Sequence, residues 1–189
     1  MDADVLKGGF ADAPIEAAHA FRAAMTAIAR PGKIETLKGA VPPAPMSVAA
    51  GTLVLTLCDP DTPVFLAGEW DCQPVRDWIA FHVGAPIVSA AEAMFAIGDW
   101  AGLAPHTQFA IGTPEYPDRS ATLIVECDAL KADGAVLRGP GIKDTASMGL
   151  PEVDAFQMNA MLFPLGLDFF FTSGDQVSAL PRTTKVEAA

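Results

Sequence analysis

The sequence predicts an α/β fold in which helices cover both faces of a mixed sheet, a three-layer α/β/α arrangement within one domain spanning residues 1–189. Short apolar segments typical of strands alternate along the chain with segments of helical periodicity. The chain also closes with an apolar hairpin: residues 167–172 form a largely apolar run with three phenylalanines in a row, typical of a strand buried on both faces. Ser173-Gly174-Asp175 then forms a turn into a returning strand, Gln176 to Leu180. Antiparallel pairing at this end makes the expected sheet mixed.

The first half of the chain predicts three helices joined by short strands. The first helix opens at Asp12-Ala13-Pro14, since proline is tolerated in a first turn, and ends at Arg30-Pro31-Gly32. Ser47 can cap a second, apolar helix up to Cys58, although its β-branched residues also permit a strand. Asp71 can cap a third helix from about Cys72 to Val83. In the first helix, apolar side chains recur at helical spacing at Ile15, Ala18, Phe21, Met25 and Ile28. Strands are expected at residues 33–37, 64–66, 86–88 and 94–97.

The second half is less regular. Residues 99–120 are interrupted by proline and glycine and predict no long element. Ala121 to Cys127 is predicted to be a buried strand, paired through a turn at Lys131–Gly134 with a second strand, Ala135 to Arg138. Glu152 to Phe163 predicts a helix that leads into the closing hairpin.

Composition narrows the class of protein. Half of the residues are hydrophobic and 19% are charged, which excludes a disordered chain and favours a subunit with a buried interface. The net charge of −11 argues against binding of nucleic acid and against an isolated polyphosphate site. The three cysteines lack CxxC spacing, so neither a disulfide framework nor a zinc site is expected. Without a secretion signal or a long apolar run, we expect a soluble, cytoplasmic protein that does not enter the membrane.

Two glycine- and serine-containing motifs are weak indications of chemistry. Arg138-Gly-Pro-Gly141 follows a strand, so its amides could face a phosphate, but it lacks the third glycine of a dinucleotide fingerprint and favours a structural turn. Thr145-Ala-Ser-Met-Gly149 misses the nucleophile elbow, and no histidine follows it in the chain. The three histidines show no metal-ligand spacing. Among them, His82 near a helix end either interacts with the last carbonyls or has a catalytic role.

Charged residues in polar segments leave further alternatives open. Asp59 and Asp61 flank a proline in a turn, where carboxylates either bond local amides or hold Mg²⁺ beside a phosphate. Arg22 projects from an apolar helix, and it either pairs with a carboxylate or binds a ligand. The same choice applies to Arg182 of the triplet Arg182-Thr183-Thr184, which either fastens the chain end to the core or offers donors to an anion.

Six segments in order along the chain resemble the PhnH family, a subunit of the bacterial carbon–phosphorus lyase system for phosphonate breakdown. They are Phe21-Arg-Ala-Ala-Met25 leading to Arg30-Pro-Gly32, Leu55-Thr-Leu-Cys-Asp-Pro-Asp-Thr-Pro63, Phe81-His-Val-Gly-Ala-Pro86, Arg138-Gly-Pro-Gly-Ile142, Phe163-Pro-Leu-Gly-Leu-Asp168 and Leu180-Pro-Arg-Thr-Thr184. The resemblance spans nearly the whole chain and is weakest from Trp100 to Ser120.

The resemblance implies a fold like that of pyridoxal-phosphate-dependent transferases, without pyridoxal phosphate (PLP). It implies a homodimer in isolation and a core complex with PhnG, PhnI and PhnJ. With PhnL, this system displaces adenine from MgATP with a phosphonate and forms α-D-ribose 1-methylphosphonate 5-triphosphate. The lysines agree with the absence of PLP, because neither Lys143 nor Lys185, the nearest candidates, lies in a buried strand-to-helix turn.

Two functional hypotheses stay open, and a third lacks support from any residue. The subunit is a docking element without a ligand of its own, or a cleft at the homodimer interface, lined by Arg22, Asp59, Asp61, Arg182 and Thr183, binds phosphonate or nucleotide. An independent PLP enzyme is the third. The sequence assigns no catalytic residue and no metal ligand. The candidate substrate- or partner-binding residues are Arg22, Asp59, Asp61, Thr62, His82, Arg182, Thr183 and Thr184.

Overall fold

The computed structural model of the chain describes residues 7–189, and it contains four α-helices in that range. The prediction that the amino-terminal segment is not a secretion signal falls partly on residues 1–6, which lie outside the described part. The helices are α1 (Ala13–Ala29), α2 (Val48–Leu57), α3 (Gln73–His82) and α4 (Val153–Met161). All four were predicted, and α2 forms a helix rather than a strand because the Ser47 hydroxyl accepts a hydrogen bond from the amide of Ala50 (3.1 Å). Asp71, the predicted cap of α3, pairs with Arg76 instead.

A six-stranded mixed sheet forms the centre of the molecule. Its spatial order is β1-β8-β7-β4-β3-β2. Strands β2, β3, β4 and β7 run parallel, whereas β8 is antiparallel to β7 and β1. The prediction of a mixed sheet is therefore confirmed. The strands are β1 (Glu35–Thr36), β2 (Val64–Leu66), β3 (Phe95–Asp99), β4 (Thr122–Glu126), β7 (Asp168–Ser173) and β8 (Gln176–Leu180). Of the predicted strand 86–88, the structure keeps one bridge, between Ile87 and Val64.

A second, antiparallel sheet contains β5 (Ala135–Arg138), β6 (Ala146–Met148) and β9 (Lys185–Glu187), in the order β6-β5-β9. The predicted hairpin between β4 and β5 is wrong, because β4 already has β3 and β7 as parallel neighbours and offers no free edge. The chain leaves the large sheet after β4 to build the small one. Strand β9, which follows the Arg182-Thr183-Thr184 triplet, was not predicted.

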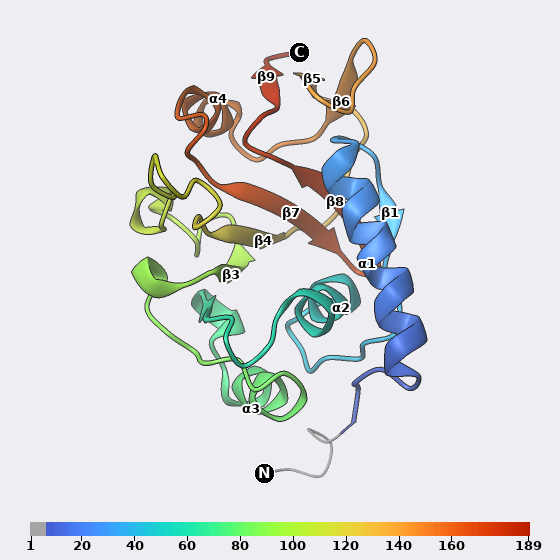
Figure 1. Cartoon of the computed structure of the whole chain (residues 1–189). Coiled ribbons are helices and arrows are strands. Elements are labelled where there is room, and N and C mark those ends of the chain that lie inside the picture. The colour runs from blue at the N-terminus through green and yellow to red at the C-terminus, as the bar shows by residue number, and fades with distance from the viewer. Residues whose placement is uncertain (1–6) are drawn as a thin grey trace.

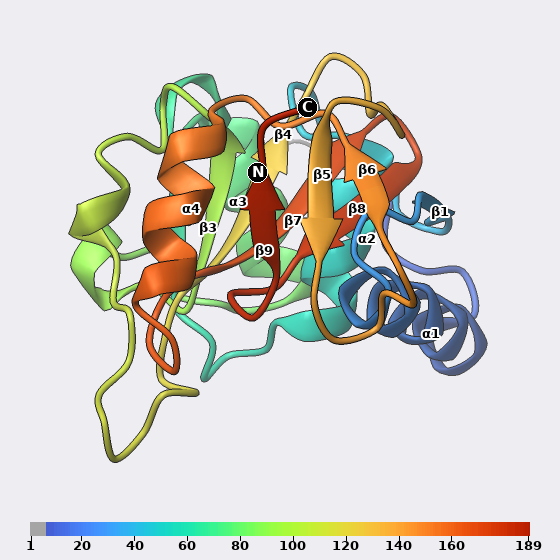
Figure 2. The same cartoon turned by 90° about the horizontal axis from the view of Figure 1, so that it is seen from above.

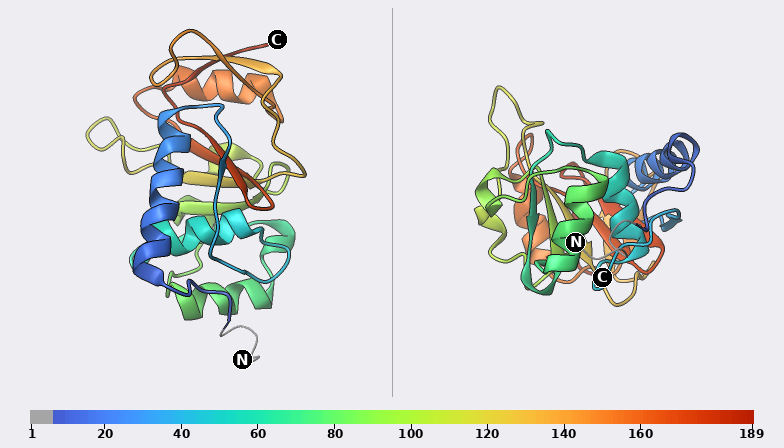
Figure 3. Two further views of the ribbon diagram at one scale, coloured as in Figure 1. Left: turned by 90° about the vertical axis from the view of Figure 1, so that its right-hand side faces the viewer. Right: turned by 90° about the horizontal axis from the view of Figure 1, so that it is seen from below.

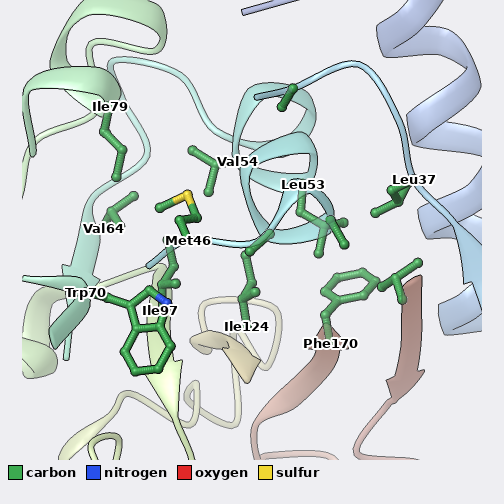
Figure 4. Packing of buried hydrophobic residues seen from close by; sticks show 14 of the residues in the cluster. Leu37, Met46, Leu53, Val54, Val64, Trp70, Ile79, Ile97, Ile124 and Phe170 are labelled. Carbon is green, nitrogen blue, oxygen red and sulfur yellow. The ribbon is translucent and has the colours of Figure 1, made fainter. Parts of the chain in front are cut away.

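Three layers result (Figure 1). Helices α1, α2 and α3 pack on one face of the large sheet, and α4 packs beside the small sheet on the other face (Figure 2). The prediction of helices on both faces is thus correct in part, since one outer layer is half helix and half sheet. The core under α2 and α3 shows the packing directly: Leu53 of α2 points toward Phe170 and Ile124 of the sheet, and Ile79 of α3 lies beside Val64 of β2 (Figure 4). Each such side chain contributes about 1.5–3 kcal/mol when fully buried.

Helix α1 packs with a face that its apolar spacing did not indicate. Its buried residues are the small Ala20, Ala24 and Ala27, and it contacts α2 and β8. Alanines permit a close approach of helix to helix, so the large side chains are left outside. Phe21 is 50% exposed and Met25 48%. The predicted helix is confirmed, but most of its apolar stripe lies on the outer side of the molecule, where α1 runs along one flank (Figure 3, left).

Candidate functional site

Arg182 lies just after β8 and is held by a nearly complete set of acceptors. Its amide donates to Oδ1 of Asp168 (2.8 Å), and its Nε donates to both oxygens of that carboxylate (3.2 Å each). Nη1 donates to the carbonyl of Pro117 (2.7 Å), and Nη2 donates to Asp168 and to the hydroxyl of Ser120. The side chain is only 11% exposed. The guanidinium therefore joins the start of β7, the loop before β4 and the chain end.

The two threonines after Arg182 lead the chain into the second sheet. The amide of Thr184 donates to the carbonyl of Pro181 (2.9 Å), which makes a tight turn before β9. Thr184 is buried, and its hydroxyl has no hydrogen-bond partner within residues 7–189. Thr183 is half-buried, and its carbonyl lies against Gly139. These contacts hold the chain end against the rest of the protein, whereas binding of a ligand by Arg182-Thr183-Thr184 stays a prediction.

The acidic turn before β2 is organised by its own first residue. Oδ1 of Asp59 accepts hydrogen bonds from the amide of Asp61 (2.9 Å) and from the hydroxyl of Thr62 (2.7 Å). The amide of Thr62 donates to the carbonyl of Asp59 (3.0 Å). Thr62 is buried, and both aspartates are exposed. This geometry is the local turn that was one of the two interpretations of the sequence.

His82 and Arg22 lie on different helices. His82 is the last residue of α3, its Nε2 lies 3.1 Å from the carbonyl oxygen of Lys7, and its ring packs on Trp78 and Phe81. It borders a cleft of about 370 Å³ whose other lining residues are Gly8, Gly9, Phe10, Ala13 and Leu55. Arg22 is exposed on the outer side of α1, and its carbonyl accepts a hydrogen bond from the hydroxyl of Thr26 (2.8 Å).

One chain does not bring the predicted cleft residues together. Among the hydrogen bonds and ion pairs of residues 7–189, none links Arg22, the turn at Asp59 or Arg182 to one another. The turn precedes β2 and Arg182 contacts the start of β7, with β3 and β4 between them in the sheet. Three strand spacings amount to about 14 Å. These residues are therefore not in direct contact within one chain, and the cleft expected at the homodimer interface stays a prediction.

An aromatic cluster occupies the region where the sequence predicted no regular element. Trp100 stacks on His106 with 3.8 Å between ring centroids and donates its Nε1 hydrogen to Glu152 (3.2 Å). Burial lowers the pKa of His106, although Glu152 and the carbonyl of Trp100 oppose this effect. Nε2 of His106 is buried and has no partner in the described part of the chain. Periodicity gave no signal for this cluster, because Trp100 and His106 lie in the irregular connection between β3 and β4 and Glu152 is the residue before α4.

In addition to the exposed apolar side chains of α1, a second apolar surface lies at the end of α4. Its four large side chains are all substantially exposed, and Met161 is 77% exposed. We call this the α4-end patch, formed by Met158, Met161, Leu162 and Phe163. Large contiguous apolar groups in water are typical of interaction sites. The helix was predicted, but its exposure was not, since periodicity cannot tell a face packed on the core from one that awaits a partner.

The described residues offer neither a metal site nor a membrane span. Within residues 7–189, no group of three or more histidine, cysteine, aspartate or glutamate side chains is arranged to hold a metal ion. None of the helices in that range is long and apolar enough to cross a bilayer.

Comparison with known proteins identifies the family. The family model described as bacterial phosphonate metabolism protein (PhnH) matches residues 8–187. The chain is 45% identical over 192 residues to the α-D-ribose 1-methylphosphonate 5-triphosphate synthase subunit PhnH of Rhizobium meliloti, covering 97% of this chain and 96% of that protein. It is 33% identical over 196 residues, or 94% of each chain, to HtxG of Stutzerimonas stutzeri, provisionally described as a C–P lyase subunit. The chain belongs to the PhnH family, as its six sequence segments predicted.

Proposed function

We propose that this protein is a subunit of an α-D-ribose 1-methylphosphonate 5-triphosphate synthase in the catabolism of organic phosphonates. The observation that carries the proposal is 45% identity over 97% of the chain to the subunit of that name. In this assembly MgATP and a phosphonate are the substrates, and the expected partners are the PhnG, PhnI, PhnJ and PhnL subunits. The protein contributes as a docking element and is not a catalyst on its own.

Two exposed apolar surfaces support a docking role. The α1 stripe comprises Ile15, Phe21 and Met25, each about half exposed. Helix α4, whose end carries the α4-end patch, lies in the opposite outer layer of the molecule from α1 (Figure 1). Burying such side chains against a partner contributes about 25 cal/mol for each Å² removed from water. The methionines of the patch also adapt easily to a partner's shape. Two separate surfaces are what a subunit with more than one neighbour needs.

The α1 stripe is the surface we assign to the homodimer. Two copies of a chain with net charge −11 repel each other, so a contact between copies must avoid carboxylates. The only acidic residue of α1 is Glu16, which is half-buried and accepts a hydrogen bond from the amide of Asp12 (3.1 Å). The helix spans about 25 Å, which is long enough to pair with its copy around a two-fold axis. The α4-end patch then remains for the other subunits.

A ligand cleft remains part of the proposal only in the dimer. Its predicted lining residues are Arg22, Asp59, Asp61, Arg182 and Thr183, which one chain holds apart. Calorimetry with ATP and methylphosphonate on the purified protein tests it. Saturable heat that disappears in an Arg22→Ala variant, which keeps the Arg182 contacts, favours the cleft, and the absence of heat favours docking alone.

We further propose that the chain binds no PLP, works in the cytoplasm and acts as a single domain with a PLP-transferase-like fold. The two lysines nearest to a Schiff-base position support the first point, because Lys143 and Lys185 are both exposed and neither lies in a closed pocket. An absorbance band near 420 nm in the purified protein would contradict it, since that is roughly where PLP aldimines absorb.

Copurification tests the docking role. Tagged wild-type protein, expressed in cells that carry the whole phosphonate system, is expected to retain the other subunits and to restore growth of a strain lacking its own PhnH on methylphosphonate. Met161→Glu puts a charge into the α4-end patch and is expected to abolish retention. Met94→Glu is the control, because Met94 is an exposed methionine as well (49%, against 77% for Met161) but lies outside both surfaces. Equal retention of both variants contradicts the assignment of the patch, and no growth with wild type contradicts the function.

A further inference from the structure

A cleft at the carboxyl end of α1 is not used by the docking role. It has a volume of about 400 Å³, within the range of small-molecule sites. Two stretches far apart in the sequence form most of it: the turn after α1, and the connection from β5 into β6; Ala132, before β5, completes the lining. Figure 2 shows this connection beside the end of α1. The lining residues are Arg30, Pro31, Gly32, Lys33, Ala132, Gly141, Ile142, Lys143, Thr145, Ala146 and Ser147.

The charged side chains that line the cleft are positive, whereas the chain as a whole is acidic. The chain has 12 lysines and arginines against 23 acidic residues, yet Arg30, Lys33 and Lys143 all line this one cleft and no carboxylate does. Lys33 pairs with Glu35 at the rim. Within residues 7–189, neither Arg30 nor Lys143 forms an ion pair. Charges that are not neutralised by the protein are available to a ligand.

Close approach of the backbone preforms the cleft. Gly32 has φ +85°, and a Cβ at this position would lie 3.0 Å from the carbonyl oxygen of Ser147. Gly141 has φ +82°, and a Cβ there would clash with the carbonyl oxygen of Ala29. The amide of Lys33 donates to the carbonyl of Arg30 (3.0 Å), so both cations project from one tight turn. Only glycine allows the turn after α1 and the stretch from β5 into β6 to meet at these two points.

We propose that this cleft binds a tetrahedral phosphorus oxyanion, the charged group shared by phosphonates and phosphate esters. Arg30 and Lys143 supply charge-assisted hydrogen bonds, and the hydroxyls of Thr145 and Ser147 supply neutral ones. The glycine loop after β5, which the sequence favoured as a structural turn, forms one wall of the cleft. It serves both as a turn and as part of the anion site. This assignment does not depend on membership in the synthase, since it rests on the lining of the cleft in one chain.

Calorimetric titration of the purified full chain tests the proposal. The probes are inorganic phosphate, methylphosphonate and ribose 5-phosphate, titrated at constant ionic strength with chloride as the background anion. Saturable binding is expected for the wild type. Lys143→Ala and Arg30→Ala each remove one charge-assisted contact, so each is expected to raise Kd by about tenfold or more. Tighter binding of ribose 5-phosphate than of the two small anions would identify a sugar phosphate as the ligand.

The matched control is Lys38→Ala, which removes another exposed positive charge outside the cleft. An unchanged Kd in this variant is expected. An equal loss in all three variants would mean that only net charge matters and would overturn the site, as would the absence of saturation with every probe. All three side chains are exposed, so the unfolding midpoint of each variant should match the wild type. Copurification of lyase subunits is scored separately, so loss of either result leaves the other interpretable.

Discussion

The Arg182→Ala variant distinguishes a residue that fastens the chain end from one reserved for a ligand. The substitution deletes the side-chain contacts to the carboxylate of Asp168, the carbonyl of Pro117 and the hydroxyl of Ser120. It also leaves Asp168, only 25% exposed, with its charge uncompensated. Such a loss is larger than the net value of the original pair, because the remaining carboxylate stays partly desolvated.

The expected destabilisation follows from the burial of the pair. Breaking a fully buried ion pair costs about 3–5 kcal/mol, and the residual exposure of Asp168 places this case near the lower end, at about 3 kcal/mol. For a domain of this size that corresponds to a fall in Tm of roughly 6–12 °C. The exposed pair between Arg76 and Asp71 provides a matched control. Arg76→Ala is expected to cost less than about 1 kcal/mol, because water screens that pair.

Urea unfolding of both variants measures these values, provided that the m-value is unchanged. The cycle with Asp168→Ala isolates the coupling between Arg182 and Asp168 from the two other contacts of the guanidinium. A loss below about 1 kcal/mol for Arg182→Ala, equal to that of the control, would refute the fastening role. Such a result, together with loss of ligand binding, would instead return Arg182 to the predicted cleft.

Four further outcomes are expected. Gly141→Ala should destabilise the protein by more than about 2 kcal/mol in urea because it adds a backbone clash to positive φ, whereas Gly174→Ala, in open space at φ +57°, should cost only about 1–2 kcal/mol. Phe21→Glu should convert dimer to monomer in sedimentation, and an unchanged dimer would contradict the α1 interface. Burial lowers the pKa of His106, so on acidification the unfolded chain takes up a proton at a higher pH than the folded chain. The free energy of unfolding should therefore decrease as the pH falls below about 6.5, and His106→Phe should reduce this decrease between pH 7.5 and 5.5. Burial raises the pKa of the Cys58 thiol to about 12, so iodoacetamide at pH 8.5 should alkylate it only after unfolding, and rapid native labelling would contradict this.

Features decided by neighbours in the sequence could be predicted, and those decided by distant segments could not. The hydroxyl of Ser47 three residues before the amide of Ala50 specified α2 as a helix, and Gly174 specified the hairpin of β7 and β8. The same kind of turn signal after β4 was misleading. A turn shows that the chain reverses there, but the strand that fills the neighbouring position in the sheet is chosen by packing over the whole molecule.

The same division applies to the candidate site. The bonds of Asp59 within its own turn reach residues two and three positions away, and the sequence included that interpretation. The partners of Arg182 lie 14, 62 and 65 residues away, so the sequence could offer only both alternatives. The basic cleft joins residues near positions 30 and 145 and was missed for the same reason. Apolar spacing in α1 was equally silent about which face meets the core, because alanine and phenylalanine both count as apolar.

Helix α1 takes part in both proposed interactions, the contact between two copies and the binding of an oxyanion. The two interactions are expected to respond differently to salt. Its outer side carries Phe21 and Met25 for a second copy, and its end places Arg30 at the cleft. Contact between apolar side chains is little affected by sodium chloride, and salt also screens the repulsion between two chains of charge −11, so dimerisation should hold or strengthen as salt rises. Binding of an oxyanion to exposed cations should weaken over the same range. If both decline together with salt, the copies are held by ion pairs and the apolar stripe is not the dimer contact. If neither responds to salt, binding of the anion does not depend on the charges of the cleft.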